Sequence, residues 1–271
     1  MDSNHSWWHL HPRIHRAWAR LLTGAITLLV SASLHASDLV RIAAAADMRY
    51  ALDEIIEHFG ETHPDINIGV VYGSSGRMTT QIINGAPYDL FFSADIAFPK
   101  RLQQEGMTAT EPAVYALGRI VLWSNTLDAS ELTLEDLTSD AIRRIAIAQP
   151  AHAPYGQRAR EAMESAGVWA DVQHKLVFGE NIAHAAQMTE SGAAQVGIIA
   201  LSLATFPELA QHGHHLIDDS LHQPLTQGFV ITRRGGDKSG ARVFAEFMST
   251  DTAHEIMTRY GFEIPERSPL Q

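Results

Sequence analysis

The sequence predicts an α/β protein with two lobes, each a mostly parallel β-sheet flanked by helices, joined by two crossover strands. Apolar strand-like runs alternate with helical patterns from Leu39 onward, and repeated βα units of this kind build parallel sheets that are covered on both faces. Two apolar runs, 120–124 and 229–232, bracket a central block in which the alternation continues. The 271 residues are enough for two lobes of about 100–150 residues each.

The part before the central block contains three strand-like runs, each followed by a helical pattern. After the first run, Leu52, Ile55 and Phe59 recur at the spacing that places apolar side chains on one face of a helix. The expected strands are 39–45, 66–72 and 90–94, and the expected helices are 48–59, 78–84 and 96–104.

The central block repeats the pattern, and two helical segments follow it. The expected strands are 145–148, 175–178 and 196–200, and the expected helices are 156–166, 182–190, 240–248 and 252–260. We therefore assign residues 38–120 and 231–271 to a discontinuous first lobe and residues 121–230 to a second lobe. The cleft between two such lobes is the default place for a ligand.

Residues 1–37 have the composition of a secretory signal peptide. Three arginines precede the apolar run 21–30, and small residues follow that run. Ten residues are too few to cross a bilayer, which needs about 20. We expect cleavage between about residues 33 and 38 and export of the remaining chain to the periplasm.

Composition and charge exclude several classes of function. The chain has no cysteine, which excludes disulfides and thiolate metal sites. Its 20 Lys and Arg against 31 Asp and Glu give a net charge of −11, which argues against nucleic acid or an anionic membrane as a partner. Bulk charge could not hold an anion on such a protein, so local dipoles would have to do so.

Four loops of small residues lie at predicted strand-to-helix turns. They are 43–47, 73–76, 154–156 and 180–182. The first N–H groups of a helix lack intrahelical partners and carry the positive end of the helix dipole, so such a loop can hold an anion. Each loop alone also fits an ordinary turn or helix cap, but all four occupy the same structural position. Together they predict an anion site between the lobes.

Several motifs resemble those of the periplasmic molybdate-binding proteins of ABC transporters. The resemblance runs from about Val40 to Pro265 and is most specific in the stretch GAPYDLFFSAD at 85–95. It extends to the Gly-Ser-Ser-Gly loop at 73–76, the Gln-Pro…Ala-Pro-Tyr-Gly segment at 149–156 and Arg-Tyr-Gly-Phe at 259–262. The resemblance implies a type II periplasmic-binding fold.

The same resemblance implies a function. It implies a monomeric binding protein, not an enzyme, that captures molybdate or tungstate and delivers it to the membrane permease of an ABC importer. The anion would be held by hydroxyl and backbone N–H groups, with no cationic side chain, no cofactor and no free metal ion. The ligand positions that carry over are Ala46, Asp47, Ser75, Tyr155 and Ile182, with Ser74, Gly76, Asn181 and Ala200 as weaker candidates.

Two of these positions depart from the family pattern. Ala200 stands where some members place a tyrosine whose hydroxyl reaches the ligand. Asp47 would place a carboxylate beside a dianion, which is costly in a cleft of low dielectric. Its side chain could instead cap its own helix, leaving only its N–H to the ligand. Otherwise the ligand could carry a proton for Asp47 to accept, as hydrogen phosphate would.

Three other functions compete with molybdate binding. The first is binding of phosphate or another protonated tetrahedral oxyanion, which could donate its proton to Asp47. A secreted metal-ion binder would use the cluster of His212, His214 and His215, although a solvated loop fits that cluster better. A serine hydrolase is disfavoured because Ser75 does not lie in a G-x-S-x-G elbow.

Overall fold

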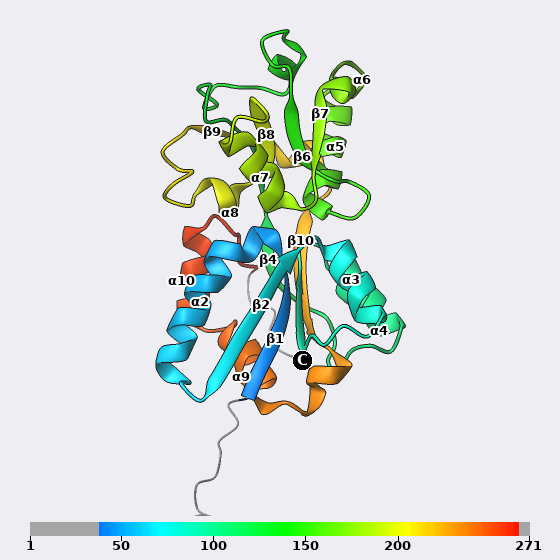
Figure 1. Cartoon of the computed structure of the whole chain (residues 1–271), viewed down its shortest axis with the longest axis vertical. Coiled ribbons are helices and arrows are strands. Elements are labelled where there is room, and N and C mark those ends of the chain that lie inside the picture. The colour runs from blue at the N-terminus through cyan, green and yellow to red at the C-terminus, as the bar shows by residue number, and fades with distance from the viewer. Residues whose placement is uncertain (1–37, 266–271) are drawn as a thin grey trace, which may run out of the picture. The chain divides into compact units, whose positions relative to one another are not determined.

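The computed structural model describes residues 38–265 (Figure 1). The predicted signal peptide lies outside the described residues and stays a prediction. Within 38–265, no helix has both the length and the apolar character needed to span a bilayer.

The first sheet contains five strands in the order β2-β1-β3-β10-β4. β1 pairs in parallel with β2 on one side and with β3 on the other, whereas β10 runs antiparallel to both β3 and β4. One reversed strand therefore interrupts an otherwise parallel sheet. The strands are β1 (Asp38–Ala45), β2 (Ile66–Gly73), β3 (Leu90–Ser93), β4 (Ala113–Gly118) and β10 (Leu225–Ile231).

Helices cover both faces of this sheet (Figure 1). Successive side chains of a strand point to opposite faces, so Ile42 and Ala44 of β1 pack in one core cluster and Ala43 packs in another. On the first face lie α2 (Arg49–Thr62), α9 (Ser239–Phe247) and α10 (Asp251–Arg259), and on the second lie α3 (Ser75–Ile83) and α4 (Ala97–Gln104).

The second sheet has the same plan, in the order β7-β6-β8-β5-β9. β6 pairs in parallel with β7 and β8, and β5 is again the single reversed strand. Its strands are β5 (Ile120–Trp123), β6 (Ile145–Ala148), β7 (Leu176–Gly179), β8 (Val196–Ala200) and β9 (His214–Leu216). Its helices are α5 (Pro154–Ser165), α6 (Trp169–Val172), α7 (Ile182–Glu190) and α8 (Leu201–Ala204).

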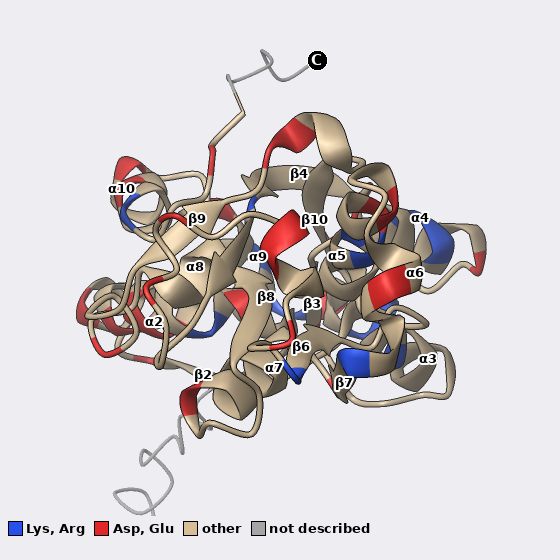
Figure 2. Ribbon diagram, turned by 90° about the horizontal axis from the view of Figure 1, so that it is seen from above, with Lys and Arg blue, Asp and Glu red and all other residues tan. Residues whose placement is uncertain are grey.

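Short 3-10 helices complete the described chain. They are η1 (Ala46–Met48), η2 (Glu135–Thr138), η3 (Gln173–Lys175), η4 (Asp219–Leu221) and η5 (Arg233–Asp237). Asp and Glu occur on many elements, including α2 and α10 (Figure 2).

The predicted fold class is confirmed, with several differences in detail. The expected lobe boundary at residue 230 runs through β10, but all of Leu225–Ile231 pairs in the first sheet. The strand begins before the apolar run 229–232. The apolar pattern missed its start because Gln227 is polar and yet fully buried among side-chain partners. The sequence patterns also did not predict β4 and β9, and α3 begins at Ser75 rather than at residue 78.

Candidate functional site

One small cavity brings the four predicted loops together. The loop after β1, the loop between β2 and α3, the loop before α5 and the start of α7 all contribute to its wall. None of the residues that line it, all within the described part of the chain, is Lys or Arg. The lining residues are Ala45, Ala46, Asp47, Gly73, Ser74, Ser75, Ala94, Ala153, Pro154, Tyr155 and Ile182.

The structure thus places six of the sequence-predicted residues in one wall and leaves three out of it. Ala46, Asp47, Ser75, Tyr155 and Ile182 are all in the lining, as is Ser74. The other three, Gly76, Asn181 and Ala200, are not among the lining residues.

Helices α3 and α5 begin at this cavity without a side-chain cap. The residues before them, Ser74 and Ala153, are extended, and neither side chain accepts a hydrogen bond from the helix start. Asn181, in contrast, caps α7 because its side chain accepts from the N–H of His184 at 3.0 Å. Uncapped N–H groups at a helix start are the usual donors to a bound anion.

Ser75 is fully buried, and its hydroxyl oxygen accepts from the N–H of Ala94 at 3.0 Å. That bond orients the hydroxyl and leaves its hydrogen available to donate. Thr79, one turn later, donates its hydroxyl to the carbonyl of Ser75 and anchors the first turn of α3. Ser75 is thereby a positioned hydroxyl donor at a helix start.

His152, which the sequence patterns did not single out, forms hydrogen bonds with two of the weaker ligand candidates, Ser74 and Gly76. The Ser74 hydroxyl and His152 Nδ1 share a hydrogen bond of 2.9 Å, and the Gly76 N–H donates to the His152 carbonyl at 2.9 Å. A Cβ on Gly76 would lie 2.8 Å from that carbonyl oxygen. Gly76 therefore permits a close backbone contact between the lobes instead of facing the cavity.

Asp47 belongs to a buried network of four side chains from both lobes. Its Oδ2 accepts from Gln227 Nε2 at 2.7 Å and from the Tyr155 hydroxyl at 3.1 Å. Gln227 also contacts the Tyr155 hydroxyl at 3.0 Å and accepts from the Tyr115 hydroxyl. These partners come from α5, β4 and β10, so tertiary contacts dominate at the Asp47 carboxyl. The backbone N–H groups of Asp47 and Met48 interact with it more weakly, and the side-chain cap that one expectation gave to Asp47 is absent at η1 and α2.

Burial dominates the acidity of Asp47. The residue is 1 % exposed, and desolvation raises its pKa from 3.8 to about 6, opposed chiefly by the hydrogen bonds from Gln227 and Tyr155. Its Oδ1 is buried and has no hydrogen-bond partner among the described residues. A carboxyl in this state is easily protonated.

Gly118 makes room for the network at the end of β4. A Cβ on this residue would lie 2.4 Å from the Tyr155 hydroxyl and 2.6 Å from Gln227 Nε2. No side chain larger than hydrogen fits there without displacing one of them. No local pattern signals this requirement, because it arises from residues distant in the sequence.

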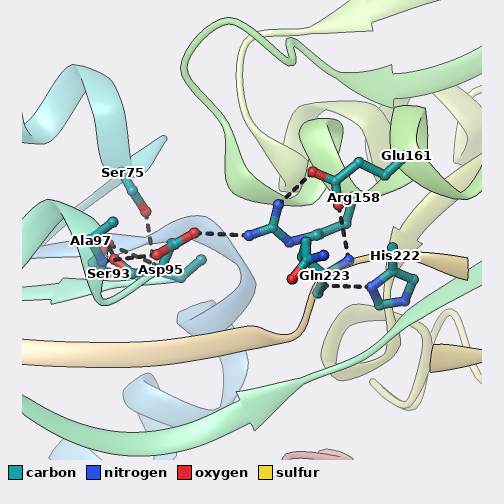
Figure 3. A network of polar contacts seen from close by, with 9 residues as sticks. Ser75, Ser93, Asp95, Ala97, Arg158, Glu161, His222 and Gln223 are labelled. Atoms are coloured by element: carbon teal, nitrogen blue, oxygen red, sulfur yellow. Dashed lines mark hydrogen bonds and ion pairs between the residues drawn. The ribbon is translucent and has the colours of Figure 1, made fainter. Parts of the chain in front are cut away.

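A second network joins the lobes beside the cavity (Figure 3). Arg158 of α5 is buried and pairs with Asp95 at 3.0 Å and with Glu161 at 2.8 Å. Glu161 in turn accepts from the N–H of Gln223 at 3.0 Å, in the segment that leads into β10. Two carboxylates thus neutralise the buried guanidinium of Arg158.

The segment after β8 contributes a hydroxyl that contacts the loop after β1. Ala200 is the fully buried last residue of β8. Two residues later, the Ser202 hydroxyl donates to the Asp47 carbonyl at 2.8 Å. That bond positions the loop after β1 from the opposite lobe.

The histidine cluster has other contacts. His212 lies edge-on to Trp123, and His214 and His215 belong to the edge strand β9. Within the described residues, no three His, Cys, Asp or Glu side chains are gathered in a way that could hold a metal ion.

Comparisons with known proteins point in one direction. The family described as bacterial extracellular solute-binding protein matches residues 40–263. The molybdate-binding protein ModA of Rhodobacter capsulatus is 34% identical over 196 residues, which cover 70% of this chain and 75% of that protein. ModA of Azotobacter vinelandii is 30% identical over 246 residues, covering 90% and 97%.

Solved structures agree with this similarity. The Azotobacter vinelandii periplasmic molybdate-binding protein superposes with a TM-score of 0.78 at 29% identity, covering 84% of this chain and all of that one. The sulfate-binding protein SubI of Mycobacterium tuberculosis reaches a TM-score of 0.67 at 16% identity, covering 85% and 88%, which is a likeness of fold alone.

Proposed function

Since this chain belongs to the bacterial extracellular solute-binding proteins, we propose that it binds molybdate in the cavity where its four loops meet and delivers it to the membrane permease of an ABC importer. The observation that carries the proposal is the wall of that cavity. It joins helix starts from both lobes, and none of the described residues that line it has a cationic side chain. Backbone N–H groups and hydroxyls can hold a tetrahedral dianion without the desolvation cost of a buried cation.

We assign the anion contacts to Ala46, Asp47, Ser75, Tyr155 and Ile182. Ser75 would donate through its hydroxyl, and the others through backbone N–H groups at or near the starts of η1, α5 and α7. Gly76 and Asn181 would support the site from outside the lining, because their polar groups already contact His152 or His184, whereas Ser74 lines the cavity but shares its hydroxyl with His152. Ala200 would not contact the anion.

Tungstate is the second ligand that we propose for the same site. It offers the same tetrahedral shape, charge and set of acceptor oxygens as molybdate, so the same donors would serve it. Sulfate is a smaller anion and would leave some of these donors without a full contact. The protein would act as an exported monomer in the periplasm, without a cofactor and without catalysing a reaction.

Calorimetry with purified residues 38–271 tests the proposal. Molybdate and tungstate should bind, and a ligand present at 100 times its dissociation constant should stabilise the fold by about 2.7 kcal/mol. Ser75→Ala should weaken molybdate binding by about 10-fold to 100-fold, because a hydrogen bond to a charged ligand contributes about 1.5–3 kcal/mol. Thr80→Ala is the matched control, since this residue of α3 is exposed and its hydroxyl donates to the Gly76 carbonyl of the same helix.

Hydrogen phosphate is the alternative ligand that one observation favours. The buried Asp47 carboxyl is an acceptor, and a protonated anion could donate to it. Tight phosphate binding without any response to molybdate would replace our assignment with this one.

A further inference from the structure

Of the described residues in the wall of the cavity, Asp47 is the one whose side chain changes its charge near neutral pH. The other ionisable group in the wall is the Tyr155 phenol, and burial raises the pKa of that hydroxyl well above its usual value. Tyr115, on the far side of Gln227, is kept neutral in the same way, because burial raises its pKa as well. Both phenols therefore donate hydrogen bonds and carry no charge around neutral pH.

The two oxygens of Asp47 have different surroundings. Oδ2 accepts two hydrogen bonds, from Gln227 and Tyr155, whereas Oδ1 is buried without a partner among the described residues. An ionised carboxylate needs donors at both oxygens to compensate for its lost hydration. A protonated carboxyl with its hydrogen on Oδ1 needs only an acceptor there.

Among residues 38–265, no neighbouring cation compensates the charge of Asp47. Three helices pack against η1: α2 carries Arg49 and Asp53 near its start and further acidic residues and His58 beyond them, α7 carries His184 and Glu190, and α8 carries no charged residue. None of these side chains contributes to the pKa of Asp47, whose causes are burial and hydrogen bonds alone. Arg49, His184 and Glu190 line a separate, open hollow. Arg158 of α5 is already paired with Asp95 and Glu161.

We propose that Asp47 takes up one proton from solvent when a tetrahedral dianion enters the cavity, and that the protonated carboxyl then donates from Oδ1 to an oxygen of the anion. The inference rests on the proposed function. A dianion offers only acceptors, so an ionised carboxyl beside it would repel it, while a neutral one adds a donor to the wall. The protein would thereby convert its one acidic wall residue into part of the anion site.

The proton count separates two classes of ligand. In the free protein at pH 7.5 the carboxyl is mostly ionised, because its pKa is about 6. Molybdate should therefore bind with the uptake of close to one proton. Hydrogen phosphate brings its own proton, which an ionised Asp47 could accept, and its binding would require no uptake.

Calorimetric titration with molybdate at pH 7.5, in buffers of different ionisation enthalpy, measures this number directly. We expect an uptake close to one proton per molybdate, and a dissociation constant that rises by up to tenfold per pH unit between pH 6.5 and pH 8.5. Asp47→Asn should bind molybdate with no uptake and with a flat pH profile. Glu190→Gln, which removes an exposed carboxyl from α7, should behave like the wild type.

A second variant tests whether Asp47 is the group that takes up the proton. Tyr155→Phe removes one hydrogen bond that lowers the pKa of Asp47, so its free carboxyl should be more protonated and the uptake at pH 7.5 should fall. If Asp47→Asn does not fold, the proton counts of this variant and of the wild type still test whether Asp47 takes up a proton when molybdate binds.

Two results would overturn the inference while leaving the proposed function intact. One is molybdate binding by the wild type without proton uptake, and the other is an unchanged uptake in Asp47→Asn. Failure of the wild type to bind molybdate at any pH would instead refute the proposed function itself.

Discussion

Arg158 and Asp95 form a largely buried ion pair that joins the two lobes, with 3.0 Å between Nη2 and Oδ2. Asp95 lies one residue after Ala94, whose N–H contacts the Ser75 hydroxyl. Arg158 also holds Glu161, which accepts from the N–H of Gln223 at the approach to β10. The pair therefore connects the wall of the cavity to the segment before β10, where the chain passes from the second sheet to the first (Figure 3).

Removing this cation should weaken both the fold and anion binding. Arg158→Met leaves Asp95 and Glu161 partly buried without their partner, a defect that should cost about 2–3 kcal/mol of unfolding free energy. Molybdate affinity should also fall, because the lobes lose a contact that holds them together. Urea denaturation and calorimetry measure the two effects.

Arg160→Met is the control for that change. Arg160 lies on the same helix and pairs with Glu164, but both side chains are exposed, so its loss should cost less than about 1 kcal/mol. Equal effects of the two substitutions would contradict the role given to Arg158.

Gly118→Ala should disrupt the network around Asp47. The added Cβ would lie 2.4 Å from the Tyr155 hydroxyl, so the variant should lose about 1–3 kcal/mol of stability and bind molybdate more weakly. Gly60→Ala in α2 should instead raise the free energy of unfolding by about 0.5–1 kcal/mol, because a Cβ there meets nothing within 4 Å and alanine favours the helix. Thermal unfolding of both variants checks the contrast.

The stability of the ligand-free protein should depend on pH through Asp47. Its pKa is raised in the folded state to about 6 from 3.8, so the folded state binds the proton more tightly than the unfolded state does. The contribution of Asp47 to stability is therefore largest below pH 4 and falls as the pH rises through 6, by about 3 kcal/mol in total.

Asp47→Asn removes this dependence and provides the measurement. The variant should be more stable than the wild type above pH 7, with a difference that shrinks as the pH falls toward 4. Urea denaturation of both proteins at pH 4.5, 6 and 8 gives that difference. A difference that is constant across these pH values would contradict the raised pKa.

Asp89 should matter for stability but not for binding, although it lies in the most specific family motif. It is fully buried, accepts from the Arg41 N–H at 2.8 Å and pairs with Lys238 at 2.7 Å, and it does not line the cavity. Asp89→Asn should cost about 3 kcal/mol of unfolding free energy, because it leaves Lys238 without its counter-ion. The molybdate dissociation constant, measured below the unfolding transition, should stay unchanged; a large change would place Asp89 in the anion site.

Much of the architecture could be predicted because its signals are local. The apolar runs that became β1, β6 and β8 and the helical pattern of α7 depend on side-chain spacing within one element. β4 was missed because half of its residues are exposed or only partly buried, which weakens the apolar pattern. The start of β10 was missed because Gln227 is polar and yet buried.

By itself, the sequence determined that four loops of small residues would open helices at the same edge of two sheets, because strand and helix periodicity places those loops there. Only the tertiary structure decided what lies beside them. The contacts of Asp47 with Tyr155 and Gln227 span 108 and 180 residues, and the Arg158–Asp95 pair spans 63. Such contacts depend on how distant segments pack within and between the lobes, and no pattern within one element encodes that. The acidity of Asp47 follows from the same contacts, because burial and distant donors set its pKa.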